Sequence, residues 1–458
     1  MRGKLTEESV LFVSVLKWLV LATVTGVVVG VSTSVFLKAL GWGLDLTGQH
    51  RDYFLLLPLA FVVSTWLIRT LAPDAEGHGT EKVIAAIHTS SGRIKPSVVP
   101  IKLVATVVTL ACGGSAGKEG PCAQIGAGLA SSLASLLRLS DEDRRKIVIC
   151  GISAGFASVF GTPIAGAIFG VEVLFVGSIL YDVLLPSFIA GITAFQVSSV
   201  LGVQYFSHSI SLTPVFSEKF LLEVAFAGVF LGLCSFFMVE TMRLGRRLAD
   251  WLPVAPLVKA LIGGSTLVGL TYSFSPYYLG LGLPAIESSL KGAITPWYTF
   301  AVKSVFTAIT LSLGGSGGIV TPIFFVGATS GSLYAGLTGL DHSTFAAIGL
   351  VAVLAGAANT PIAAAIMALE MFGSALGPYA AVACVISFLM TGHRSVYPSQ
   401  VLAVRKSGSI DVEVGREIEG VEAHFRSRPK TLSRGVLVLG RWAREKSRKV
   451  LRPPHDAE

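Results

Sequence analysis

Charged residues are scarce in this chain, and that scarcity excludes an ordinary water-soluble protein. Only 14% of the 458 residues are Asp, Glu, Lys or Arg, against about 25% in soluble globular domains. Apolar residues make up 52%, and several apolar runs are shorter than the roughly 20 residues that a straight spanning helix needs. We therefore expect an all-α, multi-pass cell-membrane protein whose tilted, broken or re-entrant helices pack inside the protein.

Cysteine is also rare. The five cysteines lie in apolar segments without paired spacing, which predicts neither disulfides nor a metal site. We likewise expect no cofactor. The net charge of +8 is concentrated after Val404, and the excess of Lys and Arg in cytoplasmic segments explains it without a nucleic-acid partner.

The most unusual stretch is GGSAGKEGPCAQIG, residues 113–126, between two apolar runs. A carboxylate at membrane depth costs about 3 kcal/mol or more, so we expect Glu119 to face protein or water and to be functional. Pro121 fits the first turn of a helix. A helix N-terminus beside closely spaced glycines predicts an anion-binding site, because free N–H groups and the positive end of the helix dipole point at it.

Three other interpretations of this stretch are open. The run from Gly113 to Gly117 matches the G-x-S-x-G pattern of serine hydrolases, with Ser115 as nucleophile; this intramembrane hydrolase is a distant alternative, and we expect no enzyme. A phosphate-binding loop needs one more residue in its spacing and has a hydroxyl where Glu119 stands. Finally, Glu119 could be an ordinary acid at a helix start.

The chain contains an internal duplication. The motif TPIA at 162–165 recurs at 360–363, and the same shift superposes Glu172 on Glu370. Further superposed pairs are Lys102 with Lys303, Thr106 with Thr307, Gly117 with Gly318, Pro121 with Pro322 and Gly126 with Gly327. Duplicated membrane proteins with glycine-interrupted segments at matching positions are typically transporters, which bind their substrate where the two halves meet.

The duplication sets the expected organisation of the chain. We predict a cytoplasmic N-terminal tail at 1–10, a first repeat over about 11–203, a second over about 217–404, and a basic cytoplasmic tail at 405–458. We expect the repeats to be inverted relative to each other. Equivalent helix N-termini then converge at the bilayer midplane and share one anion.

The two copies differ at the glycine turn. Lys118, Glu119 and Gly120 of the first correspond to Ile319, Val320 and Thr321 of the second. The backbone site is therefore doubled, whereas the carboxylate is present once. An acid that served only to begin a helix would have no reason to be missing from one copy, which favours a gate.

These residues resemble the CLC family of anion channels and proton-coupled anion exchangers. GKEGP at 117–121 is similar to one signature of that family, GGIVTP at 317–322 to another, and Tyr397 to the tyrosine of the last helix. The resemblance covers about residues 15–404. It implies a homodimer in membrane lipid, with a separate pore in each subunit and inverted halves of tilted helices.

The resemblance also implies roles for single residues. Glu119 would be the gating glutamate, which competes with the anion and takes up an external proton. The N–H groups of Ile319 and Val320 and the Tyr397 hydroxyl would bind the central anion, and those around Lys118 to Gly120 an outer one. Without that resemblance Tyr397 could be an interfacial tyrosine. Chloride is the expected anion, with fluoride, nitrate and bromide open.

The first family signature is altered here. Gly77, His78, Gly79, Thr80 and Glu81 stand where the family has glycine, serine, glycine, isoleucine and proline. An imidazole N–H can bind an anion as a hydroxyl does, so we expect His78 in the anion site. The alternative is that His78 caps a helix beginning near Thr80 or lies off the pathway.

In exchangers of the family, an internal glutamate hands protons toward the gate, and it directly follows a first glutamate in the helix that begins near TPIA. Here Glu172 holds the first position and Val173 the second. This favours passive or weakly coupled transport. Exchange for protons, delivered by Glu172 or by water, is the alternative. Because Glu370 repeats the position, Glu172 could instead be a structural acid bonded to backbone N–H groups.

The tail is too short for the paired regulatory domains that some CLC proteins carry. Residues 432–451 carry apolar side chains among basic ones and could lie on anionic lipid as an amphipathic helix. A solvated, disordered tail is favoured instead.

Overall fold

The computed structural model describes residues 2–205 and 217–425, which are nearly all helical. Five helical stretches in this part are long and apolar enough to cross a membrane: 6–48, 53–71, 181–200, 218–251 and 320–338. Other apolar helices are only 10–17 residues long. The uneven helix lengths expected from the apolar runs are therefore confirmed. Helices this short can lie at membrane depth only when protein surrounds them.

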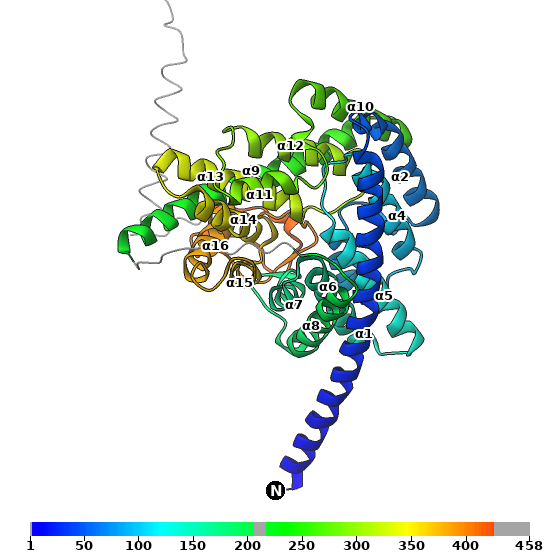
Figure 1. Ribbon diagram of the computed structural model, residues 1–458. Coiled ribbons are helices and arrows are strands. Elements are labelled where there is room, and N and C mark those ends of the chain that lie inside the picture. Colours follow the sequence, from blue (N-terminus) through cyan, green and yellow to red (C-terminus); the bar gives the residue numbers. More distant parts are fainter. Residues whose placement is uncertain (1, 206–216, 426–458) are drawn as a thin grey trace, which may run out of the picture.

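The sixteen helices of the described residues form two series of eight (Figure 1). The first series is α1 (Arg2–Gly48), α2 (Leu57–Leu71), α3 (Thr80–Ser90), α4 (Val98–Ala111), α5 (Glu119–Leu136), α6 (Asp141–Phe160), α7 (Pro163–Glu172) and α8 (Leu184–Val200). The second is α9 (Glu218–Trp251), α10 (Pro256–Ser273), α11 (Leu283–Leu290), α12 (Thr299–Ser312), α13 (Val320–Thr338), α14 (His342–Ala358), α15 (Pro361–Phe372) and α16 (Gly377–Thr391). Each helix has its counterpart eight places along.

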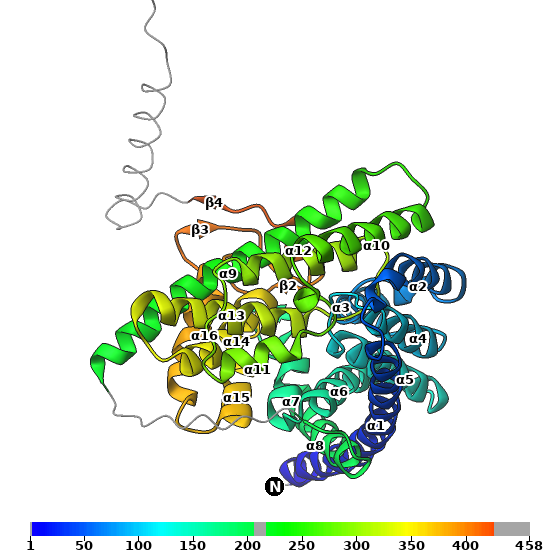
Figure 2. The same ribbon diagram turned by 45° about the horizontal axis from the view of Figure 1, so that its top comes forward.

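The two series lie side by side and interlock at their edges. In Figure 1 the blue and cyan helices of the first series occupy one side, and the yellow and orange helices of the second occupy the other. The exception is α10, which leaves its own series and packs on α2. In the tilted view of Figure 2, α7 and α15 meet where the two series join.

Glycine pairs let the inner helices approach closely. A Cβ on Gly126 of α5 would lie 2.4 Å from the carbonyl oxygen of Gly151 on α6. The equivalent pair in the second series, Gly327 of α13 and Gly349 of α14, gives the same 2.4 Å. Close backbone packing through small residues is how membrane helices associate without a hydrophobic driving force. Helix α14 packs against α9, α11, α13, α15 and α16, and every residue from Thr344 to Ala358 is buried.

Two acids cap the helices of the opposite series. Glu172, at the end of α7, accepts hydrogen bonds from the N–H groups of Ile362 (3.0 Å) and Ala363 (2.8 Å) at the start of α15. Glu370 of α15 accepts in return from Ile164 (2.9 Å) and Ala165 (2.8 Å) at the start of α7. A carboxylate at a helix N-terminus satisfies free N–H groups and the helix dipole. The exchange of partners indicates a pseudo-twofold relation.

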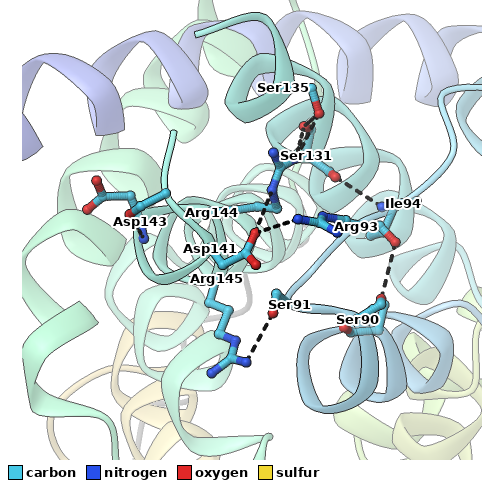
Figure 3. Close-up of polar contacts among 12 residues, drawn as sticks. Ser90, Ser91, Arg93, Ile94, Ser131, Ser135, Asp141, Asp143, Arg144 and Arg145 are labelled. Atoms are coloured by element: carbon cyan, nitrogen blue, oxygen red, sulfur yellow. Dashed lines mark hydrogen bonds and ion pairs between the residues drawn. The ribbon is translucent and has the colours of Figure 1, made fainter. Parts of the chain in front are cut away.

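A polar corner joins the ends of α3, α5 and α6 (Figure 3). Arg144 donates to Ser135 Oγ at 2.7 Å, and Arg93 pairs with Asp141 at 2.9 Å. Nearby, Lys17 of α1 pairs with Asp143 at 2.6 Å, which places this corner on the same face as the N-terminal part of α1.

The chain after α16 differs from the sequence-based expectation. Tyr397 lies in an irregular segment, not in a last helix, because α16 ends at Thr391. Strand β2 (Val401–Leu402) then pairs in parallel with β1 (Phe175–Val176). Two further strands, β3 (Ile410–Asp411) and β4 (His424–Phe425), pair antiparallel.

The boundary expected at residue 404 therefore falls inside a packed segment. Val412 and Ile418 are buried against Val176 and Leu402, so apolar burial continues well past it. Segment 405–425 belongs to the folded part of the chain and not to a free tail. The alternatives for residues 432–451 concern a part of the chain outside the described residues.

The reciprocal caps predict matched losses of stability. Glu172→Gln and Glu370→Gln should each lower the free energy of unfolding by about 1–2 kcal/mol, because an amide replaces two charge-assisted bonds with at most one neutral acceptor. Thermal unfolding of the purified protein would measure this. Glu142→Gln is the control, since its side chain is 80% exposed. Equal melting temperatures for all four proteins would contradict the capping role.

Candidate functional site

The glycine turns of the two series hydrogen-bond directly to each other. Gly117 N–H donates to the Gly318 carbonyl at 2.7 Å, and Gly318 N–H donates to the Gly117 carbonyl at 2.6 Å. The turns immediately precede α5 and α13, so two helix N-termini meet at one point. This confirms the expected convergence, and it concentrates free N–H groups and two positive dipole ends in the protein interior.

A third helix start joins them. Gly79 has φ of +87° and precedes α3, and a Cβ there would lie 2.4 Å from the Gly120 carbonyl oxygen. A Cβ on Gly120 would lie 2.0 Å from the His78 carbonyl oxygen. Only glycine fits at either position, because any side chain would push the starts of α3 and α5 apart.

Two buried lysines bind the backbone turns that precede α3 and α11. Lys102 donates to the carbonyls of Ala75 (3.0 Å) and Gly77 (2.5 Å), and Lys303 donates to those of Tyr278 (3.0 Å) and Gly280 (2.9 Å). Both lysines are fully buried. The duplication had paired these lysines but did not indicate that each one holds a turn in place.

Glu119 points from the first series into the second. It is buried, its Oε2 accepts from Thr321 N–H at 3.1 Å, and its Oε1 accepts from the Thr321 hydroxyl. The carboxylate thus occupies N–H and O–H donors at the start of α13. Thr321 was missed as a functional residue, although the repeat alignment had placed it opposite Gly120.

Ile319 and Val320 lie where α13 begins and are both buried. Their N–H groups belong to the first turn, which has no intrahelical acceptors. Lys118 occupies the matching position before α5 and reaches the surface of a cavity. The backbone N–H groups expected to bind the anion thus lie at the starts of α5 and α13, and their role in binding stays a prediction.

His78 and Tyr397 are neighbours, with ring centroids 5.6 Å apart. His78 precedes Gly79, which is the N-cap of α3. Its buried Nδ1 has no hydrogen-bond partner among the described residues, and neither has the Tyr397 hydroxyl, although Thr80 lies beside it. Buried polar atoms are rarely left unsatisfied, so this pair of orphaned atoms suits a small ligand or water.

Two cavities approach the site. One, of about 480 Å³, is lined by Lys118, Glu119 and Thr321, together with Phe160 and Tyr205. The other, of about 350 Å³, is lined among others by Glu76, His78, Glu81, Lys82, Arg246, Asp250 and Ser399. They share no lining residue. The first is called the outer cavity below, and the second, which Lys82 and Arg246 line, is called the inner cavity.

Glu172 lies outside both cavities. It is 5% exposed, and both of its oxygens accept from backbone N–H groups. Val173 beside it is fully buried. The geometry favours the structural alternative for Glu172 over a proton carrier.

Ser115 belongs to the contact between the series. Its Oγ lies 3.2 Å from Thr307 Oγ1, and its N–H donates to Thr310 Oγ1 at 3.0 Å. Ser316 makes the equivalent pair of contacts to Thr106 and Thr109, at 3.1 and 3.0 Å. A nucleophilic serine needs a base in hydrogen-bond contact, and these hydroxyl partners supply none.

Comparisons with known proteins agree on one family. Residues 59–392 match the family described as voltage gated chloride channel. A chloride/fluoride channel protein from Pseudomonas syringae pv. tomato is 39% identical over 402 residues, which cover 86% of this chain and 88% of that protein. The H(+)/Cl(−) exchange transporter ClcA of Klebsiella pneumoniae is 26% identical, covering 77% of this chain and 80% of its own.

Solved structures give the same result. A CLC-type fluoride/proton antiporter superposes with a TM-score of 0.80 and 29% identity, covering 84% of this chain and 97% of that chain. A slow cyanobacterial Cl−/H+ antiporter, at TM-score 0.72 and 21% identity, covers 82% and 94% and shows the fold alone. The chain therefore belongs to the CLC family of voltage gated chloride channels and related transporters, and it is a multi-pass anion transport protein.

Proposed function

We propose that this protein exchanges fluoride for protons across the cell membrane, through a pathway gated by Glu119 in each subunit of a homodimer. The observation that carries the proposal is the contact of the Glu119 carboxylate with the N–H and hydroxyl of Thr321. An anion bound at the start of α13 would need these same donors. Carboxylate and anion therefore compete for one place.

This competition links the anion to a proton. An ionised Glu119 keeps the donors of Thr321 and blocks the pathway. A protonated Glu119 has lost the charge that the helix N-terminus attracts, so the anion displaces it. Each passage of the carboxyl between the anion site and the outer cavity can then carry a proton in the direction opposite to the anion.

The donors suit a small, strongly hydrated anion. Fluoride gives up its hydration only for strong hydrogen bonds, and the site offers the Thr321 hydroxyl, the Tyr397 hydroxyl and the His78 imidazole in addition to backbone N–H groups. No full cation is in this donor set. Backbone and hydroxyl dipoles bind an anion without trapping it, which transport requires.

Passive conduction of fluoride or chloride is the second candidate. It is favoured by Val173, which cannot carry a proton, and by the engagement of both Glu172 oxygens in a helix cap. The Pseudomonas syringae relative is also named a channel protein.

Flux measurements separate the two candidates. The protein in lipid vesicles should move protons uphill when a fluoride gradient is imposed, with a reversal potential displaced by an opposed pH gradient. Empty vesicles are the control. A potential that tracks fluoride alone at every pH gradient would contradict exchange and establish passive conduction.

Removing the Glu119 charge should remove the pH dependence of the anion flux. In Glu119→Gln and Glu119→Ala the side chain no longer changes charge as it enters or leaves the pathway, while the anion still passes. Vesicle flux from pH 5 to 8 would show this. Glu218→Gln, which alters an exposed helix-start acid on α9, should keep the wild-type profile. A Glu119 variant with that same profile would refute the gate.

Replacing His78 should change anion preference. His78→Asn keeps a side-chain N–H and should retain the fluoride-to-chloride flux ratio better than His78→Ser, whose shorter hydroxyl reaches less far. His78→Ala, without any donor, should change the ratio most. A fluoride-to-chloride flux ratio equal to that of the unmodified protein in all three variants would place His78 off the pathway.

A further inference from the structure

Glu81 lies in the wall of the inner cavity with one oxygen engaged and one free. Its Oε1 accepts from both the N–H (3.1 Å) and the hydroxyl (2.5 Å) of Ser399. Its Oε2 is buried and has no hydrogen-bond partner among the described residues. A buried carboxylate oxygen without a donor is costly when ionised, so this carboxyl is suited to exist in both protonation states.

Its position connects the cavity with the anion site. Glu81 stands in the first turn of α3, three residues after His78, whose Nδ1 is also unpartnered within the described chain. Ser399, which binds Glu81, follows Tyr397 by two residues. The carboxyl therefore lies between the inner cavity, which both Glu81 and His78 line, and the segment that carries the Tyr397 hydroxyl.

The charges around Glu81 are of both signs. They come from its own helix and from the elements packed against it: His78, Lys82, Glu76, Lys102, Arg246, Asp250 and Glu419. Within the described residues, none forms an ion pair with Glu81, and Arg246 lies 4.0 Å from Glu419 instead. Glu81 can therefore gain or lose a proton without breaking an ion pair.

Glu172 is the obvious alternative and differs in each respect. Both of its oxygens accept from backbone N–H groups, and it lines neither of the two cavities that reach the site. Protonating it would break a helix cap between the two series. The cytoplasmic proton must enter elsewhere if protons are exchanged.

We propose that Glu81 is the proton-exchanging group on the cytoplasmic side of the pathway. This rests on the proposed exchange of fluoride for protons. In the first step, the ionised Oε2 takes a proton from hydronium in the inner cavity and leaves a water. In the second step, it gives that proton to a water between His78 and the gate, which becomes hydronium, so charge and atoms balance. The chain thereby replaces the acid missing at Val173 with one on another helix.

Paired flux measurements test this assignment. The full-length protein in vesicles is given a fluoride gradient, and fluoride efflux and proton movement are recorded together. Glu81→Gln, which keeps the shape and an acceptor for Ser399, should lower proton transport at least about tenfold, with much less effect on voltage-driven fluoride efflux. Glu81→Asp should recover part of the proton transport.

Two control variants distinguish proton exchange by Glu81 from a change in local electrostatic field and from a loss of structure. Glu419→Gln removes the same charge near Arg246 without touching Glu81, and should keep the wild-type proton-to-fluoride ratio. Should Glu81→Gln also lose fluoride efflux, Ser399→Ala decides: a structural clamp predicts the same loss of both fluxes, which would overturn the proposal, whereas a proton carrier predicts that proton transport persists.

Two failures are distinguishable. A wild-type ratio in Glu81→Gln would overturn the role of Glu81 and leave fluoride exchange intact. If the unmodified protein moves fluoride and no protons, the exchange itself fails, and the assignment of Glu81 fails with it.

Discussion

The double hydrogen bond between Gly117 and Gly318 is the contact on which the rest of the structure depends. Donor–acceptor distances of 2.7 and 2.6 Å bring the two backbones so close that side chains are excluded between them. A Cβ on Gly318 would lie 2.7 Å from the N atom of Gly120. This approach brings the starts of α5 and α13 together. Without it, the free N–H groups of the two helices would point at separate positions.

Reciprocal contacts around this bridge are symmetric, and the chemistry arises where symmetry fails. Ser115 and Ser316 exchange threonine partners, and Glu172 and Glu370 exchange helix caps. The residues after the glycine turns break this symmetry, with Glu119 facing Thr321. Two equal halves would give a permanently open anion site with equal access from both faces. In the proposed mechanism, one carboxylate on one half makes occupancy of the anion site depend on proton concentration.

The sequence predicted what composition and repetition encode. Glycine turns, an acid at membrane depth and a chain duplicated around them identify the helix starts and Glu119, because such residues are costly elsewhere in an apolar chain. Thr321, the free oxygen of Glu81 and the irregular backbone at Tyr397 depend on contacts between distant segments. Neither periodicity nor spacing carries that information. For Glu172 the repeated acid did indicate a structural role, which the helix caps favour.

The buried lysines explain how the turns present donors to an anion. In a trans peptide the carbonyl of one residue and the N–H of the next point in opposite directions. Lys102 binds the Gly77 carbonyl, so the N–H of His78 is directed away from the lysine. Lys303 and Gly280 repeat this arrangement in the second half. Each ammonium group thus orients a turn through its carbonyls. In the proposed mechanism, Lys102 then acts on the anion through the turn at His78, without a direct contact that would trap the anion.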